Sequence, residues 1–169
     1  WCLFVRSNET LSPNIILEYI KTMTNQKMVA YMGLVKYISG DSFFIKYLND
    51  PRRGVGLKKG GEPIHYKFLL FNNSMIQTAA LKQVKIASHL RYYGGEELDF
   101  AYRLSCLYPG AICACPGAVV YRYNYPSLKN HCIRLEEFGN KNLKMLSANL
   151  QRIIVGYGFL LKGGGVARF

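Results

Sequence analysis

The chain has 169 residues, half of them apolar, so it can bury a substantial core, and one compact domain is the expectation. This composition argues against an intrinsically disordered chain, and no apolar segment reaches the ~18 residues needed to span a bilayer. Five cysteines without framework spacing argue against a disulfide scaffold and favour reduced thiols in a cytosolic compartment.

The net charge of +12 suits anionic partners. Nucleic acid, an anionic membrane face, and diphosphate-bearing donors or lipid-linked acceptors all match its sign. The basic residues are spread along the chain with one local cluster over 52–59, and no predicted helix has the continuous basic stripe of a nucleic-acid reader. We therefore expect no nucleic-acid partner, and a cytoplasmic protein that its charge would hold near the inner face of a membrane.

The predicted elements begin with the apolar run WCLFV at Trp1, which has the composition of a buried strand cut out of a larger sheet, so we expect N-terminal sequence to be missing. Ser12 then provides a helix N-cap, with Pro13 at the first helical position. The apolar spacing predicts helices over 13–24 and 42–49 and strands over 28–37 and 65–71. Between them, the glycine-rich and basic segment 52–63 has loop composition.

The second half of the chain also alternates helices with strands. Asn72-Asn73-Ser74 predicts the start of a helix that runs to about Val84. Further helices are predicted from near Glu96, from Ser127 and from about Asn140, and short strands over 111–114 and 119–123. The helix from Ser127 is expected to turn Leu128, Cys132, Leu135 and Phe138 inward and to stop at Gly139. The alternation indicates an α/β layered fold.

Three carboxylates stand close together at Glu96, Glu97 and Asp99, directly after Gly94-Gly95. Acids favour the first turn of a helix because of the helix dipole, so the cluster has a plain structural explanation. Against it, two glycines let another molecule approach the backbone closely, and a carboxylate there can take a proton from an incoming hydroxyl. Asp99 can pair with Arg103 one turn further on, which leaves Glu96 and Glu97 for a substrate.

The segment 93–104, YGGEELDFAYRL, resembles the Gly-Gly-Glu-Asp segment of family 2 glycosyltransferases and of the galactosyltransferase C-terminal region. Upstream, FNNS at 71–74 resembles the asparagine-containing strand end of these proteins. Downstream, CPGAVVY at 115–121 resembles the strand that follows their acidic helix. The order and spacing of all three segments agree with the family, and the resemblance covers most of residues 1–140.

The resemblance implies an α/β GT-A-like fold over 1–140, a mixed sheet flanked by helices without its N-terminal nucleotide-binding strands, followed by a helical extension over 141–169. It implies transfer of a sugar, with inversion, from a nucleoside diphosphate sugar to a carbohydrate or lipid-linked acceptor. Glu97 stands at the position of the catalytic base, where a glutamate replaces the usual aspartate. The residues that would contact the acceptor are Glu96, Asn73, Tyr93, Gly94 and Gly95.

Two departures from the family concern its metal ion. Arg6 and Asn8 occupy the positions of the family's Asp-x-Asp, and Arg122 stands where a metal-binding histidine would fall. A hard divalent cation requires anionic oxygen ligands, so cationic side chains at two of these positions would repel it. One hypothesis is a metal-independent enzyme in which Arg6 and Arg122 offset the donor's diphosphate charge. The alternative is a frame shifted by a residue or two, with Glu9 as a ligand of Mn²⁺ or Mg²⁺.

Other residues leave the function open between several readings. His131 lies beside Lys129 and Arg134 in a stretch that approaches the donor phosphates in relatives; a solvated helix face is the alternative. Tyr92 and Tyr93 would stack on a sugar ring or pack in the core.

A non-catalytic carbohydrate-binding or assembly module of the same fold is a rival function, to which the loss of the aspartates points. A basic nucleic-acid-binding domain is a second rival, which the charge permits and no motif supports.

Overall fold

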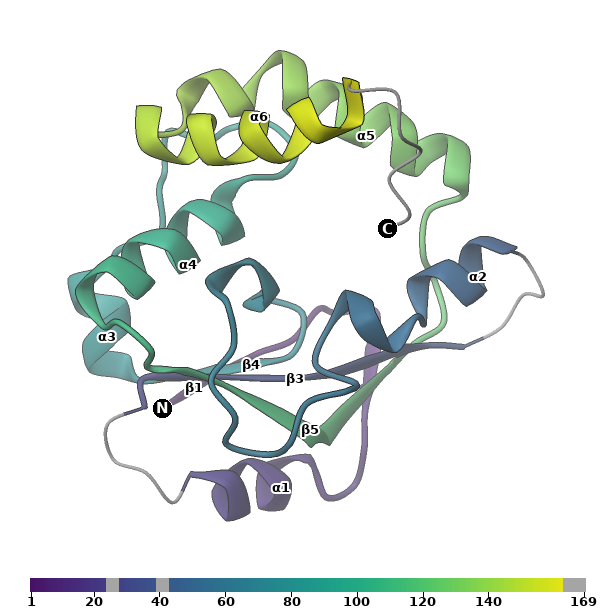
Figure 1. The fold of residues 1–169 in the computed structure, drawn as a ribbon. Coiled ribbons are helices and arrows are strands. Elements are labelled where there is room, and N and C mark those ends of the chain that lie inside the picture. Colours follow the sequence, from purple (N-terminus) through teal and green to yellow (C-terminus); the bar gives the residue numbers. More distant parts are fainter. Residues whose placement is uncertain (24–27, 39–42, 163–169) are drawn as a thin grey trace.

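The computed structural model describes residues 1–23, 28–38 and 43–162 and has a mixed α/β fold (Figure 1). Its five-stranded sheet has the order β1-β4-β3-β5-β2. The strands are β1 (Cys2–Phe4), β2 (Glu9–Leu11), β3 (Ala30–Tyr37), β4 (Ser74–Ile76) and β5 (Ile112–Arg122). β3 and β5 are parallel, whereas the other neighbouring pairs are antiparallel. The predicted α/β class is therefore confirmed.

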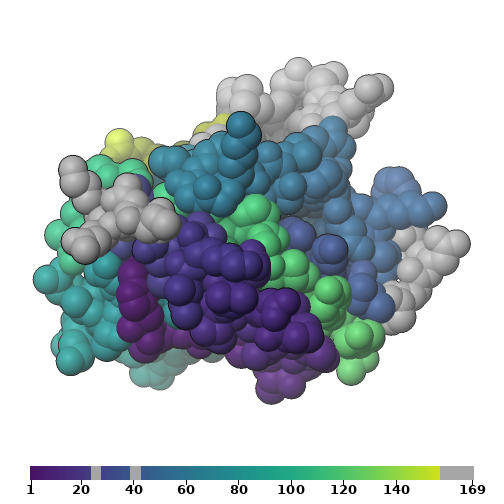
Figure 2. Space-filling model, turned by 90° about the horizontal axis from the view of Figure 1, so that it is seen from below, coloured from purple at the N-terminus to yellow at the C-terminus, as the bar shows by residue number. Residues whose placement is uncertain are grey.

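Helices lie on both sides of the sheet. They are α1 (Ile15–Thr22), α2 (Phe43–Leu48), α3 (Thr78–Gln83), α4 (Glu96–Leu107), α5 (Leu128–Asn140) and α6 (Ala148–Lys162), with 3₁₀ turns η1 (Pro51–Arg53), η2 (Tyr66–Phe68) and η3 (Asn142–Met145). α1 covers one face, seen directly in Figure 2. α4 lies over the other face, with α5 and α6 side by side beyond it (Figure 1). None of the helices in the described residues is long and apolar enough to cross a membrane.

The core follows the two-residue period of the central strands. Tyr31, Cys113 and Cys115 pack on the α1 side, whereas Met32 and Ile112 pack with α3 and α4 on the opposite side. Both faces of β3 and β5 are therefore buried, as expected for a parallel pair with a helix layer on each side. All five cysteines are free thiols.

Several predicted elements are confirmed because their signals are local. Helices form near both expected positions in the first half, and α4 begins at Glu96 directly after the two glycines. The side chain of Ser127 caps α5 by accepting a hydrogen bond from the N–H of Asn130 at 3.3 Å. Within α4, Arg103 donates to the carboxylate of Asp99 at 2.7 Å, which confirms the expected pair.

The predicted elements in three segments of the chain are wrong. The segment 65–71 contains η2 instead of a strand, because the N–H of Lys67 bonds to the His65 ring and the chain turns. The segment 72–84 is not one helix: β4 pairs on both edges, with β1 and β3, and α3 starts only after Gln77. The two short strands predicted over 111–123 are one strand, β5, whose pairing with β3 is interrupted by a bulge between Gly33 and Leu34.

The expected inward face of α5 is also wrong. Leu128 and Leu135 are about half exposed, and Cys132 is exposed. Only Phe138 packs inward, in a cluster with Leu146 of the segment after α5. The Phe138 ring lies against the chain at Gly94-Gly95. Beyond α5, η3 and α6 pack on α4 through a small apolar cluster of their own.

Candidate functional site

A cavity of about 190 Å³ gathers side chains from both ends of the chain. We call it the arginine cavity, after Arg6, Arg53, Arg122 and Arg134, which line it. The turn after β1, η1, the end of β5, and α5 each contribute one of these arginines. Among the residues predicted for the site, the cavity brings together Arg6, Tyr93, Glu97, Arg122 and His131.

Glu97 lies in the first turn of α4, at the cavity wall. Its Oε1 accepts the N–H of Phe71 at 3.0 Å and a guanidinium N–H of Arg6 at 3.3 Å. Its other oxygen, Oε2, makes no hydrogen bond to any described residue. The side chain keeps 20% of its surface exposed. The Arg6 guanidinium and the Phe71 N–H therefore fix the orientation of Glu97 through one oxygen and leave the other available.

Arg6 and Arg122 meet a second carboxylate, that of Glu9. The turn between β1 and β2 is closed by Glu9, whose Oε2 accepts the backbone N–H of Arg6 at 2.8 Å. In the sheet, Glu9 pairs directly with Arg122, which is 8% exposed and donates its Nε–H to the carbonyl of Asn124 at 3.1 Å. Burial raises the pKa of Glu9, against the opposing effect of its bond from Arg6 and the charges of Arg122 and Arg6. Arg6, Arg122 and Glu97, which line the cavity, and Glu9 behind them thus form a group of two arginines and two carboxylates, which we call the balanced end.

The balanced end does not suit a divalent cation. The structure shows no group of three metal-ligating side chains among the described residues. Arg6 donates its guanidinium N–H to Glu97 and its backbone N–H to Glu9, and Arg122 adds a second positive charge. The second oxygen of Glu9 is buried without a hydrogen-bond partner among the described residues. A hard cation needs several anionic oxygens and no cationic neighbours. The two arginines therefore disfavour the shifted frame with Glu9 as a ligand of Mn²⁺ or Mg²⁺, which stays a prediction that a chelator can test.

A second group of side chains that line the arginine cavity consists of Arg53, His131 and Arg134. The Arg53 guanidinium lies 3.9 Å from the centre of the Tyr47 ring, and that of Arg134 lies 5.0 Å from the centre of the Tyr93 ring. Burial, together with the charges of Arg53 and Arg134, lowers the pKa of His131. These three side chains therefore form a second group, which we call the cationic end.

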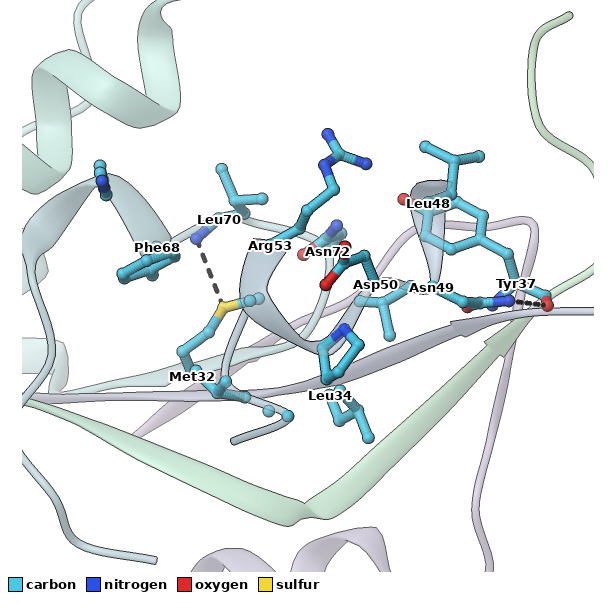
Figure 3. A pocket seen from close by; sticks show the side chains of 17 residues that line it. Met32, Leu34, Tyr37, Leu48, Asn49, Asp50, Arg53, Phe68, Leu70 and Asn72 are labelled. Atoms are coloured by element: carbon cyan, nitrogen blue, oxygen red, sulfur yellow. Dashed lines mark hydrogen bonds between the residues drawn. The ribbon is translucent and has the colours of Figure 1, made fainter. Parts of the chain in front are cut away.

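A smaller cavity of about 130 Å³ adjoins the arginine cavity and shares Arg53 and Asn72 with it. Figure 3 shows Asp50 and Asn72 in this cavity above Met32 and Leu34 of β3, whereas the Arg53 side chain extends away from the sheet. Asn72 is 5% exposed, and its Oδ1 is buried with no hydrogen-bond partner among the described residues. We call this cavity the adjoining lobe.

Other predicted site residues lie elsewhere. Asn73 is fully buried: its Nδ2 donates to the carbonyls of Leu34 and Ala118, and its Oδ1 accepts from the Tyr19 hydroxyl. Its side chain has no exposed surface that an acceptor could contact. In this structure, Asn73 holds neighbouring segments of the fold together instead of lining an acceptor site. Asn8 donates to the carbonyl of Asn124 and does not line the cavity.

The acidic turn itself also differs from expectation. Glu96 does not line the arginine cavity, and its Oε2 is buried without a partner among the described residues. Gly94 and Gly95 adopt φ angles of 80° and 96°, which explains the need for glycine. The group that approaches Gly95 most closely is the ring of Phe138, 2.8 Å from where a Cβ would lie. The two glycines therefore leave room for the Phe138 ring of α5. The predicted contacts of Glu96, Gly94 and Gly95 with an acceptor have no support in this geometry.

Sequence reasoning did not assign Arg53, Arg134 and Asn72 to the site. The signals were present but ambiguous: Arg53 belongs to the basic cluster before the glycine-rich segment, and Arg134 lies one helical turn from His131. Asn72 could not be distinguished from Asn73, its neighbour. Comparison with models of known protein families and with curated proteins finds no match to this chain.

Proposed function

We propose that this chain is the acceptor-side part of a GT-A-like glycosyltransferase domain, which transfers a sugar from a nucleoside diphosphate sugar to a hydroxyl group with inversion. The observation that carries the proposal is the position of Glu97. Its carboxylate lies at the start of an acidic helix and lines the same cavity as four arginines from four separate segments. A base beside a strongly cationic cavity suits a reaction that deprotonates a hydroxyl and releases a diphosphate.

In the proposed reaction, Glu97 takes the proton of the acceptor hydroxyl. The acceptor oxygen forms a bond to the anomeric carbon from the face opposite the diphosphate, and the bond between that carbon and the diphosphate oxygen breaks. The leaving group departs with the bond's electron pair, and its negative charge needs compensation. Arg6 and Arg122 supply it in place of a cation, because guanidinium groups form paired hydrogen bonds to phosphate oxygens.

The pairing of Arg6 with Glu97 favours a second candidate function. Oε1 of Glu97 already carries two hydrogen bonds, from Arg6 and from the Phe71 N–H. A site that had lost its chemistry and kept its charge pairs would look similar. The rival is a non-catalytic module of the same fold that binds carbohydrate or serves in assembly.

The net charge supports a location for either function. At +12, the chain is attracted to anionic lipid, and a lipid-linked or polysaccharide acceptor at the inner membrane face is consistent with that charge. This placement is part of the proposal.

The first experiment measures sugar transfer and donor hydrolysis by the natural protein with a panel of nucleotide sugars, with and without EDTA. Glu97→Gln retains an acceptor for the Phe71 N–H but cannot take a proton, so kcat should fall by ~10²–10⁴. Glu96→Gln, one residue away and outside the cavity, should keep most of the activity.

Transfer that resists EDTA and is lost in Glu97→Gln supports the enzyme with arginines in place of a metal. Transfer that EDTA abolishes refutes the role given to Arg6 and Arg122. If no donor is turned over, or if Glu97→Gln is as active as the unchanged protein, the catalytic proposal fails, and the non-catalytic module is favoured in the first of these cases.

A further inference from the structure

The two ends of the arginine cavity differ in how their charges are compensated. At the balanced end, Arg6 pairs with Glu97, and Arg122 lies opposite Glu9 in the sheet. At the cationic end, Arg53, His131 and Arg134 form no ion pair with any carboxylate of the described residues. Asp50 in the adjoining lobe interacts electrostatically with Arg53, but its carboxylate pairs with Arg52 at 2.5 Å. Like charges that line a cavity repel one another, so this end is more favourable when an anion occupies it.

The two guanidinium groups of the cationic end are held in place by aromatic rings. Arg53 lies over Tyr47 and also donates to that residue's carbonyl at 3.5 Å. Arg134 lies over Tyr93, and the His131 ring is 5.5 Å from the ring of Phe44. Aromatic faces orient a cation without neutralising its charge. The geometry therefore keeps positive charge both fixed and available.

Asn72 gives an independent indication that a ligand binds here. The exposed fraction of Asn72 is only 5%, although the residue lines both the arginine cavity and the adjoining lobe. Its Oδ1 has no hydrogen-bond partner among the described residues. A buried amide oxygen without a hydrogen-bond partner lowers the stability of the fold unless a ligand supplies the missing donor. The adjoining lobe, about 130 Å³, is close to the ~150 Å³ cavity that accommodates one benzene ring, so it can hold a single six-membered ring.

We propose that the cationic end is a phosphate subsite, separate from Arg6 and Arg122, that binds a phosphate group carried by the acceptor substrate. Arg53 and Arg134 supply forked guanidinium donors and His131 a ring N–H, a set that suits the three oxygens of a phosphate ester. Asn72 lies between this subsite and the lobe, where it can bond to the rest of the ligand. The assignment to the acceptor rests on the proposed function, whereas phosphate binding itself does not.

The test uses His131 as a reporter in the whole protein. The pKa of His131 is read by NMR from its ring proton, in buffer without phosphate and then with inorganic phosphate, glucose 6-phosphate or a short-chain prenyl phosphate. An anion between Arg53 and Arg134 offsets their repulsion of the imidazolium, so its pKa should rise by roughly one pH unit. Arg53→Gln and Arg134→Gln should each weaken phosphate binding at least tenfold.

Arg152→Gln on α6 is the control, because it removes one positive charge outside both cavities. If all variants bind phosphate equally, or if phosphate leaves the pKa of His131 unchanged, the subsite is refuted. If the protein binds inorganic phosphate but neither of the two esters, the assignment to the acceptor is refuted. If it binds one ester more tightly than inorganic phosphate, the assignment is supported, and the preferred ester shows whether the acceptor is a sugar phosphate or a lipid phosphate. No step requires turnover, so an inactive enzyme would leave this result standing.

Discussion

Asn72 and Asn73 are adjacent in the chain, but their amides have opposite surroundings. The Asn73 amide connects three segments, through Tyr19 in α1, Leu34 in β3 and Ala118 in β5. The Asn72 amide points to a cavity and has an unpaired oxygen. Both residues lie in the turn before β4, and their side chains project into different surroundings, so one asparagine has a role in the fold and the other is left for a ligand.

This contrast gives the first prediction. Asn73→Ala should lower the free energy of unfolding by about 2–4 kcal/mol, because buried carbonyls lose their donor and a buried hydroxyl loses an acceptor. Asn72→Ala removes an unsatisfied buried group, so its stability should remain within about 0.5 kcal/mol of the unchanged protein or exceed it. Urea unfolding of both variants measures the difference. Equal losses in the two would show that the Asn73 hydrogen bonds do not hold the strands together.

The site could be predicted from sequence only where a motif ordered its residues. Glu97, Tyr93 and Arg122 belong to segments with recognisable order, and they do meet in one cavity. Arg53 could not be assigned in the same way, because it comes from a turn whose path depends on contacts distant in the sequence. Asn73 was misassigned because a polar residue at a strand end resembles a ligand-binding residue until its partners across the sheet are known.

At the scale of elements, the junction of α4 and α5 depends on one glycine. Gly95 has a φ of 96°, and the Phe138 ring lies 2.8 Å from the position of an added Cβ. Asn142 holds the preceding loop by donating to the carbonyls of Tyr92 and Gly94. The start of the acidic helix is therefore fixed from the α5 side, and with it the orientation of Glu97.

Gly95→Ala should destabilise the protein by about 2–3 kcal/mol, from backbone strain and the clash with Phe138. Gly139→Ala is the matched control: an added Cβ there meets nothing within 4 Å, and alanine favours a helix over glycine by up to about 1 kcal/mol. Thermal unfolding compares the two variants. A neutral Gly95→Ala would mean that α5 can move away from α4 at little cost.

The elements that sequence predicted correctly are those with local signals. The glycine pair before α4 and the serine cap of α5 act within one turn, so they can be read without the rest of the fold. β4 could not be predicted, because Ser74–Ile76 is too short to show a period and is stabilised by pairing on both edges. The outward face of α5 has the apolar spacing of a buried face, and nothing in the segment reveals which side the sheet lies on.

At the scale of the whole molecule, two histidines with lowered pKa values make the free energy of unfolding sensitive to acid. Burial lowers the pKa of both His65 and His131 from the ordinary 6.5, so the folded state favours their neutral forms. Their contribution to stability is present above pH 6.5 and is lost as pH falls through their folded-state pKa values. Glu9 has the opposite sign: its raised pKa makes the folded protein less stable as pH rises above its ordinary value of 4.5.

The free energy of unfolding should therefore decrease as pH falls below 6.5, and His131→Gln should make this decrease smaller. Urea unfolding at a series of pH values, in buffer without phosphate, measures the slope. His89→Gln is a control with no expected change, since His89 belongs to neither cavity. An unchanged slope in His131→Gln would mean that the charges of Arg53 and Arg134 do not act on it in the folded state.

The bulge in β5 has a consequence for how this sequence can vary. Gly33 pairs with Cys115 and Leu34 with Val119, so three residues of β5 are accommodated between two successive rungs, and the Asn73 amide bonds across the gap. Beyond the gap, alternation along β5 turns Arg122 toward the cavity and Tyr121 away from it. Gaining or losing a single residue over 116–118 would turn Tyr121 toward the cavity and Arg122 away from it. A change in the length of this stretch would therefore remove an arginine from the site without altering any residue that lines it.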